Sequence, residues 1–327
     1  MKKDCKFAAT AITNTYPLKV IKNYNNFTIS KKSIVTIGTF DGVHLGHQKI
    51  LEKLVATSKK ENYNSVLLTF FPHPRMVLQK DASIKLIHTI EERIAMLEKT
   101  GLDYLIIHPF DAAFSRLTAH EFVRSVLVEH LDTAQLVIGY DHRFGKNREG
   151  NFEQLEEYGH MYDFKVNEIS ALDIDAISVS STKIRKALSS GDVHKANTYL
   201  GNPFSLSGTI VTGDRIGNTI GFPTANLEIV ENYKMIPKNG VYLVRSQLQD
   251  VWRYGMMNIG VRPTVNGSNR TLETHFFNFE GDLYGQKIQV ELLDFIREEQ
   301  KFHSLEQLKN QLFEDKERSL NMVKAYV

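Results

Sequence analysis

The stretch SIVTIGTFDGVHLGHQKI, from Ser33 to Ile50, decides the fold of the first half of the chain. It passes from an apolar, β-branched strand through a glycine-rich turn into the start of a helix. In a parallel α/β sheet, ligands bind beyond the carboxyl ends of the strands, which is where this turn lies. The free N–H groups of a helix N-terminus bind anions, and His44 and His47 share one face of the first turn. The stretch therefore predicts a phosphate site.

Other interpretations of this turn have less support. A glycine-rich turn after a strand is often only a tight turn, and a zinc site needs ligands beyond His44 and His47. No HExxH pattern, no Walker GK[ST] and no GxGxxG accompanies the pair. The density of suitable residues within ten positions favours phosphate: Gly38, Phe40, Asp41, Gly42, His44, Gly46 and His47.

Strand and helix patterns alternate up to about residue 200. Short apolar runs without polar alternation predict strands at 33–40, 65–71, 103–110, 134–140 and 164–170. Helical spacing and capping residues predict helices at 47–62, 89–101, 118–131, 151–164 and 180–201. Alternating β and α elements with buried strands indicate a Rossmann-like, doubly wound parallel sheet.

The pattern changes after Gly201-Asn202-Pro203. Short strands separated by Gly, Asn and Asp turns are predicted at 204–213, 224–229, 240–248, 251–260, 272–279 and 287–297. No helix is expected between them, which indicates an antiparallel sheet or small β-barrel. A terminal helix follows, with an apolar stripe formed by Leu305, Leu308, Leu312 and Leu320. We expect an α/β domain at 1–187, a linker at 188–203 and an all-β domain at 204–327.

The composition excludes several classes of protein. The 327 residues carry 40 basic and 38 acidic side chains, a net charge of +2, so no basic surface for nucleic acid or an anionic membrane is expected. A single cysteine, Cys5, allows neither a disulfide framework nor a thiolate metal site. No signal peptide or membrane-spanning run is evident, and a cytoplasmic protein is expected.

Four blocks of the first half, in order, resemble the HxGH nucleotidyltransferases. They are GTFDGVHLGH at 38–47, TFFPHPR at 69–75, IGYDHRFGKNREG at 138–150 and SSTKIR at 180–185. Together they are similar to the adenylyltransferase module of bacterial bifunctional riboflavin kinase/FAD synthetases. The resemblance implies a transfer of AMP from ATP to FMN, with His44 and His47 stabilising charge on the phosphates. It also implies nucleotide contacts from Gly38, Phe40, Asp41, Gly42, Gly46, Asp141, Ser181, Thr182 and Arg185, and flavin contacts from His73 and Pro74.

In this module His73 allows another interpretation, and His142 differs from the family pattern. His73 lies between two prolines, so without the resemblance a rigid turn is an equally good interpretation. His142 stands where the family usually carries Phe, which affects the wall that contacts the nucleotide or flavin.

The second half has its own candidate site in GDRIGNTIGFPTANLEI, residues 213–229. Thr224 and Asn226 supply neutral oxygen atoms that suit Mg²⁺ held jointly with ATP phosphates. From the residues alone, a glycine-rich hairpin is the slightly better interpretation. The stretch nevertheless resembles the GFPTAN signature of riboflavin kinases, followed in family order by GVYLV, NIGVRPT and LETHFFNFEGDLYG.

The riboflavin kinase resemblance assigns further roles. Glu273 is the expected catalytic base for the riboflavin 5′-hydroxyl, because a carboxylate in an apolar strand is desolvated; a solvent-facing strand residue is the alternative. Asn218 stands where a basic residue is common, and Arg215 lies three residues earlier. Asn258, Arg262 and Pro263 are expected to shape the flavin pocket, with a plain turn at Arg262-Pro263 as the alternative. The nucleotide contacts expected here are Gly213, Gly217, Gly221, Pro223, Thr224 and Asn226.

The prediction is a two-site enzyme that makes FMN from riboflavin and then FAD from FMN, using ATP and Mg²⁺. Its partners are these small molecules, with no nucleic acid or membrane, and it is a monomer or weak homo-oligomer. One alternative is a riboflavin kinase with a degenerate adenylyltransferase module. Another is a flavin-binding regulator, but no helix-turn-helix or basic stripe supports a nucleic-acid arm.

Overall fold

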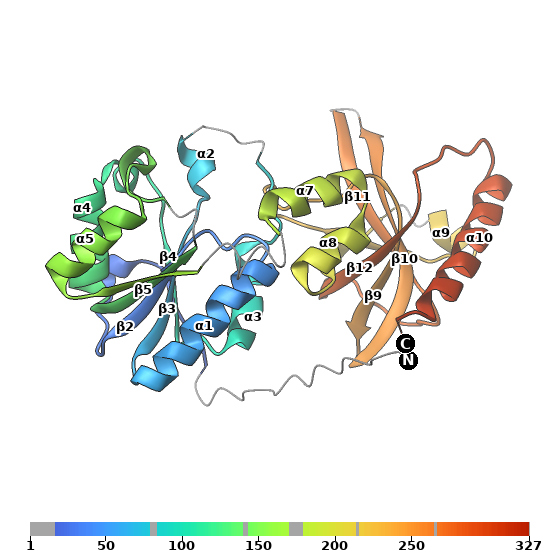
Figure 1. Cartoon of the computed structure of the whole chain (residues 1–327). Helices are drawn as coiled ribbons and strands as arrows, with labels where there is room; N and C mark the ends of the chain where they lie inside the picture. The colour runs from blue at the N-terminus through green and yellow to red at the C-terminus, as the bar shows by residue number, and fades with distance from the viewer. Residues whose placement is uncertain are drawn as a thin grey trace, which may run out of the picture. The chain divides into compact units, whose positions relative to one another are not determined.

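A computed structural model describes residues 17–78, 84–139, 143–169, 179–213, 216–264 and 267–326. The chain divides into two compact units (Figure 1). The α/β unit comprises Met1–Ala82 and Arg93–Ala176, and the barrel unit comprises Ser83–Glu92 and Ile177–Val327. Among the described residues, no helix is both long and apolar enough to cross a membrane.

The α/β unit is built on a six-stranded sheet in the order β1-β4-β3-β2-β5-β6, and every neighbouring pair is parallel. The predicted parallel sheet is confirmed. Its strands are β1 (Lys19–Ile21), β2 (Ser33–Ile37), β3 (Asn64–Phe70), β4 (Tyr104–His108), β5 (Thr133–Gly139) and β6 (Lys165–Ile169). Strand β1 has no counterpart in the sequence prediction, since its three residues are too few to show a period.

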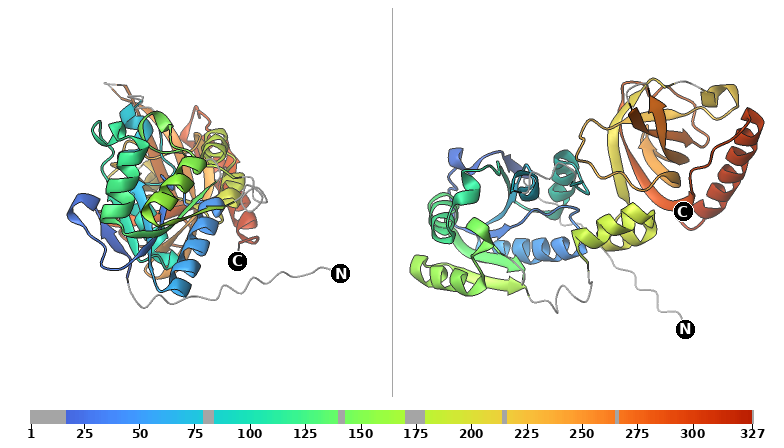
Figure 2. Two further views of the ribbon diagram at one scale, coloured as in Figure 1. Left: turned by 60° about the vertical axis from the view of Figure 1, so that its left-hand side comes forward. Right: turned by 90° about the horizontal axis from the view of Figure 1, so that it is seen from above.

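Helices cover both faces of this sheet, as Figure 2 shows. Neighbouring residues of β2 enter different cores: Ile34 packs with Leu51 and Leu54 of α1, and Val35 packs with Phe122 and other residues from α4 and η4. The helices are α1 (Leu45–Glu61), α2 (Pro74–Leu78), α4 (Ala119–Phe122), the π-helix η4 (Val123–His130) and α5 (Phe152–Tyr162). Short 3₁₀ turns are η1 (Tyr24–Asn26), η2 (Glu98–Thr100), η3 (Phe114–Arg116) and η5 (Lys146–Arg148).

The predicted helix starts are confirmed in their capping bonds. Thr118 and Glu121 form a capping box at the start of α4. At α3 (Ile90–Leu97), the Thr89 hydroxyl accepts from the Glu92 N–H and the Glu92 carboxylate accepts from the Thr89 N–H. Such reciprocal bonds satisfy N–H groups that have no partner within the helix, which fixes where the helix begins.

The barrel unit contains a closed barrel in the order β10-β11-β8-β7-β12-β9, with antiparallel pairs, which confirms the predicted barrel. Its strands are β7 (Phe204–Val211), β8 (Ala225–Glu228), β9 (Gly240–Leu248), β10 (Val251–Thr264), β11 (Gly267–Phe276) and β12 (Lys287–Arg297). The helices are α7 (Ser181–Ser190), α8 (Val193–Leu200), α9 (Ile216–Thr219) and α10 (Leu305–Val323).

One sequence expectation for this unit is wrong, because a short helix, α9, interrupts the strands within the glycine-rich loop. The apolar stripe on α10 is only partly buried, since Leu305 and Leu320 are 58% and 42% exposed. The buried positions of α10 are Asp315 and Ser319, and the Arg297 guanidinium donates to both oxygens of Asp315.

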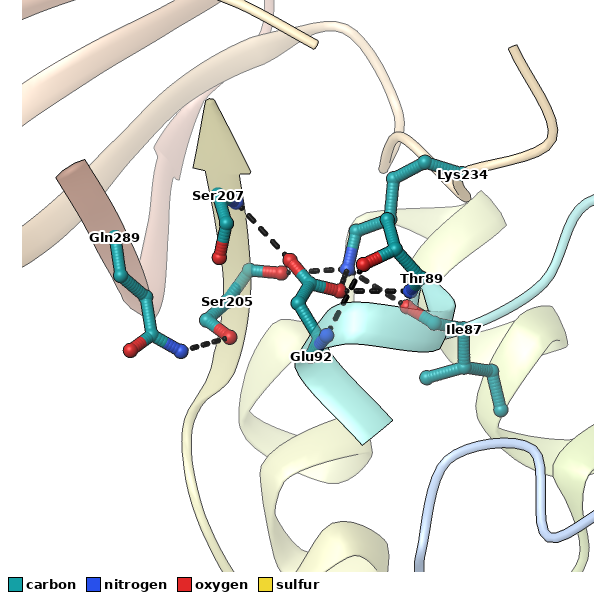
Figure 3. A network of polar contacts seen from close by, with 7 residues as sticks. All are labelled: Ile87, Thr89, Glu92, Ser205, Ser207, Lys234 and Gln289. Atoms are coloured by element: carbon teal, nitrogen blue, oxygen red, sulfur yellow. Dashed lines mark hydrogen bonds and ion pairs between the residues drawn. The ribbon is translucent and has the colours of Figure 1, made fainter. Parts of the chain in front are cut away.

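A segment from the first half of the chain, residues 84–92, belongs to the barrel unit. Leu86 forms a parallel bridge with Lys234, and Ile87 joins the barrel core. The Lys234 ammonium forms a buried ion pair with Glu92 and donates to the carbonyls of Ile87 and Ser205 at 2.8 and 2.7 Å (Figure 3). Breaking a buried pair by removing one partner typically costs about 3–5 kcal/mol. This network therefore anchors residues 84–92 to the barrel.

Candidate active sites

The turn after β2 has an unusual backbone. Phe40, Gly42 and Val43 have φ angles of 47°, 94° and 40°. Only glycine adopts this region without strain, so Phe40 and Val43 each cost about 1–2 kcal/mol. Both side chains are only 2% exposed, and their burial offsets the strain. A Cβ at Gly38 would lie 3.0 Å from the Phe40 ring, so the ring would have to shift to accommodate a side chain there.

His44 and His47 lie together at the start of α1, as predicted. Their rings stack with centroids 3.6 Å apart, and the Phe40 ring stacks on His47 at 4.5 Å. His44 is the N-cap of α1, and its Nδ1 accepts a bond from the His47 N–H at 3.3 Å. Since Nδ1 is an acceptor, the proton of neutral His44 lies on Nε2. The helix start therefore presents an imidazole N–H donor beside its own backbone donors.

Burial keeps this histidine pair neutral. Desolvation lowers the pKa of His44 to about 4, although the charge of the buried Asp41 opposes the shift. Desolvation also lowers the pKa of His47 well below its usual value, and His44 and Arg93 lower it further. At neutral pH the pair therefore offers hydrogen-bond donors without formal charge, in a partly dehydrated site where such donors act strongly.

The predicted flavin contacts His73 and Pro74 lie in the α/β unit, beyond β3. Pro74 is the first residue of α2, where a missing N–H costs nothing. His73 Nδ1 accepts from the Arg75 N–H at 3.1 Å. The prolines thus shape a turn into a helix, and His73 and Pro74 as flavin contacts stay a prediction.

Three of the predicted nucleotide contacts of this module do not lie in the α/β unit. Ser181, Thr182 and Arg185 are residues of α7, in the barrel unit, and Arg185 Nε donates to the Lys85 carbonyl at 2.9 Å. A phosphate site that combines them with the histidine pair stays a prediction. Asp141 and His142 lie outside the described residues.

The barrel brings three predicted kinase residues into one row. In the strand register, Glu273 of β11 is directly opposite Asn226 of β8 on one side and Asn258 of β10 on the other. Directly opposed residues in antiparallel strands point to the same face of the sheet. The row Asn226–Glu273–Asn258 therefore combines the expected metal ligand, base and flavin contact, and all three residues are half-buried.

The GFPTAN loop packs tightly beside this row. A Cβ at Gly213 would lie 2.3 Å from the Asn226 amide nitrogen, and one at Gly217 would lie 2.1 Å from the Phe222 carbonyl. Gly221 has a φ of 85° with open space around it. His275 Nδ1 lies 2.9 Å from the Pro223 carbonyl oxygen and is its hydrogen-bond partner. Any side chain at Gly213 would displace the proposed metal ligand.

Thr224 lines a cavity of about 310 Å³ in the barrel unit. Its wall includes Pro223, the aromatic Phe276 and Phe279, and the hydroxyl-bearing Thr274. Thr274 is only 2% exposed, and its Oγ1 has no hydrogen-bond partner among the described residues. The cavity thus offers apolar walls and an unsatisfied hydroxyl next to a predicted nucleotide contact.

Two further expectations concern residues that are only partly described. Arg262 and Pro263 lie within β10, opposite Asn269 and Ser268, so the alternative of a plain turn at these positions is wrong. Their flavin contact stays a prediction. Arg215 lies outside the described residues.

Comparison with known proteins matches two parts of the chain to two family models. The family model described as FAD synthetase matches residues 26–183, and that described as riboflavin kinase matches residues 200–323. A protein of Buchnera aphidicola subsp. Schizaphis graminum, named bifunctional riboflavin kinase/FMN adenylyltransferase, is 40% identical over 314 residues, covering 94% of this chain and 99% of its own. The chain belongs to the bifunctional riboflavin kinase/FMN adenylyltransferase family.

Other similar proteins agree with this membership. The Escherichia coli (strain K12) bifunctional riboflavin kinase/FMN adenylyltransferase is 38% identical over 301 residues, covering 91% of this chain and 96% of its own. A Streptococcus pneumoniae crystal structure titled as a macrolide-efflux protein is 31% identical with a TM-score of 0.84, covering 94% of this chain and 99% of that one. The solved structure therefore shares the fold of this chain over nearly its whole length.

A bifunctional riboflavin kinase/FMN adenylyltransferase carries out two reactions, and this chain carries both domains. It is a riboflavin kinase and an FMN adenylyltransferase, with riboflavin, FMN and ATP as its small-molecule substrates. The FAD synthetase match also includes residues 84–92 and the start of α7, which pack into the barrel unit. The boundary between the two family matches therefore differs from the boundary between the two compact units.

Sequence reasoning missed several residues that support these sites. They include His275, which bonds the Pro223 carbonyl, and Arg93, which donates to the Thr39 carbonyl at 2.6 Å. Their partners are far away in the sequence, so no local pattern reveals them.

Proposed function

We propose that the row Asn226–Glu273–Asn258 performs the kinase step and that the His44–His47 pair stabilises the adenylyl transfer. The observation that carries the kinase assignment is the register that sets Glu273 between the two asparagines. The α/β assignment rests on two stacked, neutral histidines at a helix N-terminus. The observation that carries each assignment lies within one unit.

In the kinase step, Glu273 accepts the proton of the riboflavin 5′-hydroxyl as that oxygen attacks the γ-phosphorus of ATP. The bond between the γ-phosphorus and the bridging oxygen breaks, and ADP leaves with its electron pair. Phosphoryl transfer needs positioning and charge stabilisation more than covalent chemistry, so a well-placed carboxylate suffices as the base. Asn258 orients the flavin from the adjacent strand.

The residues around Asn226 fit Mg²⁺. Thr224 and Asn226 provide neutral oxygen atoms, and Gly213 leaves room for the Asn226 amide where a Cβ would collide with it. Mg²⁺ usually keeps several waters and is bound by few protein groups together with substrate phosphates. Bound there, Mg²⁺ would neutralise charge on the ATP phosphates. Thr224 and Asn226 are accordingly the proposed ligands.

In the adenylyl transfer, a phosphate oxygen of FMN attacks the α-phosphorus of a second ATP. The bond to the β-phosphate breaks and pyrophosphate leaves, so negative charge builds on the leaving group. His44, with its proton on Nε2, and His47 donate to the phosphate oxygens, and the N-terminal N–H groups of α1 add to this field. The proposal extends to Asp141, Ser181, Thr182 and Arg185 as nucleotide contacts and to His73 and Pro74 as flavin contacts.

Several broader statements belong to the same proposal. The functional modules are placed at 1–187 and 204–327 with a linker at 188–203. The protein is proposed to act in the cytoplasm, as a monomer or weak homo-oligomer. A riboflavin kinase with a degenerate adenylyltransferase module is the remaining alternative.

The test is the product profile of the full-length protein. Riboflavin, ATP and Mg²⁺ are supplied, and flavins, ADP and pyrophosphate are separated and quantified over time. We expect FMN to appear first with one ADP, and FAD to follow with one pyrophosphate. FMN that accumulates without FAD would favour the kinase-only alternative, and tight flavin binding without ATP turnover would favour a regulator.

A further inference from the structure

The turn between Thr39 and Val43 needs an external support, because its backbone is strained at Phe40 and Val43. Strained conformations persist only where the surrounding structure holds them. Two supports come from the turn and α1: the Val43 N–H donates to the Phe40 carbonyl at 3.2 Å, and Gln48 Nε2 donates to the Val43 carbonyl at 2.8 Å. Both act on the end of the turn that leads into α1.

The start of the turn is held by a residue from another element. One terminal nitrogen of Arg93, in α3, donates to the Thr39 carbonyl at 2.6 Å and lies 3.4 Å from Thr69 Oγ1. The Thr69 hydroxyl itself donates to the same carbonyl at 3.2 Å. The peptide immediately before Phe40 is therefore fixed by a guanidinium and a hydroxyl.

Burying the charged side chain of Arg93 costs free energy that an apolar side chain of the same size would not cost. Arg93 is 2% exposed and is among the largest fully buried side chains of the chain. Taking a charge out of water costs several kcal/mol, and apolar residues of similar volume often replace buried charges without loss of stability. A residue that only filled space at this position would not need a guanidinium.

The charge of Arg93 also reaches the catalytic pair, since it is one of the causes that lower the pKa of His47. The groups that act on this pair are His44 at the N-cap of α1, Arg93 in α3 and, through His44, the buried Asp41 of the turn. Arg93 thus acts on the site in two ways: it bonds the Thr39 carbonyl of the turn, and its charge lowers the pKa of His47.

We propose that Arg93 is a positioning residue for the adenylyl transfer: it holds the Thr39 carbonyl, and with it the turn that places Phe40 against the His47 ring. This inference rests on the proposed role of His44 and His47. Arg93 touches no substrate in this account. A displacement of about 1 Å at a reacting centre can cost a hundredfold in rate, so a loosened turn lowers turnover.

The test compares Arg93→Met, Arg93→Lys and Thr69→Val in the full-length protein, with Arg124→Met as the matched control. Arg124 belongs to the same unit, but its side chain is 63% exposed and pairs with Glu129. For each variant, kcat and KM for ATP and FMN are measured in FAD formation. Riboflavin phosphorylation in the same preparation reports on the barrel unit.

We expect Arg93→Met to lower kcat for FAD formation by about tenfold or more, with FMN formation unchanged. Arg93→Lys keeps the charge and one bond, so its loss is smaller. In Arg93→Met the acid limb of the pH profile moves to higher pH, because the charge that lowers the pKa of His47 is gone. Thr69→Val weakens the same carbonyl contact without changing charge, so it lowers kcat modestly and leaves the acid limb in place.

The outcomes separate this inference from the proposed function. If His47→Ala leaves FAD formation unchanged, the assignment of the histidine pair is wrong, and with it this inference. If His47→Ala impairs FAD formation but Arg93→Met has the kcat and pH profile of Arg124→Met, only the role of Arg93 is refuted. If Arg93→Met does not fold, Arg93→Lys and Thr69→Val decide: wild-type kcat in both refutes the inference, and a loss in both supports it.

Discussion

The two proposed active sites hold their polar groups in opposite ways. In the α/β unit, the proposed site is a strained turn beside two stacked, uncharged histidines, of which His44 is buried and His47 is half-buried. In the barrel unit, the site is a row of half-buried groups on three regular strands, with a carboxylate at its centre. In the proposed roles, a donor for a leaving pyrophosphate benefits from dehydration, whereas a base must reach a substrate hydroxyl. The proposed roles therefore place different demands on the two sites.

The largest loss of activity is expected from substitution of Glu273, the central residue of the row Asn226–Glu273–Asn258. Glu273→Gln keeps the shape of the side chain but removes the base, so FMN formation should fall by about a hundredfold to ten-thousandfold. FAD formation from supplied FMN should stay unchanged. Steady-state rates of both reactions measure this, with Glu228→Gln on the exposed part of β8 as the control. Equal losses in both reactions would show that the sites are not separate.

The reciprocal variant acts on the histidine pair. His47→Ala removes a donor to the phosphates, so FAD formation from FMN should fall by about a hundredfold while FMN formation is spared. The exposed His160 of α5 provides the control variant His160→Ala. Undiminished FAD output from His47→Ala would mean that the pair does not stabilise the leaving group.

Within the barrel unit, loss of a buried ion pair should lower the free energy of unfolding more than loss of an exposed one. Lys234→Met leaves the Glu92 carboxylate buried without its ammonium and should destabilise the unit by roughly 3–5 kcal/mol in chemical unfolding. The control, Lys238→Met, breaks a pair with Glu298 whose side chains are 40% and 60% exposed, and should cost less than about 1 kcal/mol. Similar costs for the two variants would contradict the anchoring role of Lys234.

The stability of the α/β unit should fall in acid. His44 binds its proton near pH 4 in the folded chain and near pH 6.5 when unfolded, so the unfolded state gains protons first as the pH falls. Stability is full above pH 6.5 and is lost between pH 6.5 and 4, by at most roughly 3 kcal/mol for this group. His44→Asn keeps an N-cap side chain and should flatten this dependence. The measurement is unfolding free energy between pH 7 and 4, and an unchanged slope in His44→Asn would refute the assignment.

The α/β site was predictable because its determinants are local. Glycines, histidines and the helix start lie within ten residues, and the capping pairs Thr89–Glu92 and Thr118–Glu121 mark helix starts by short-range chemistry. The order of the strands in the sheet did not follow from the sequence, although the parallel arrangement did. The strained backbone at Phe40 and Val43 was also not readable, since neither residue favours a positive φ.

The barrel site depended on contacts between distant segments. The sequence singled out Asn226, Asn258 and Glu273, but only the register of β8, β10 and β11 sets them in one row. The same limit applies to α10. Its stripe residues Leu305 and Leu320 are exposed, and the buried Asp315 accepts hydrogen bonds from Arg297 of a distant strand.

The assignment of residues 84–92 to the barrel unit bears on how the gene can be divided. A single scission between the two family matches, at residues 184–199, would release a carboxyl-terminal fragment without Ile87 and Glu92. Lys234 would then keep its place in the barrel but lose its counter-ion. Because the barrel unit includes Ser83–Glu92, transferring it as a cassette requires that segment to be carried together with Ile177–Val327.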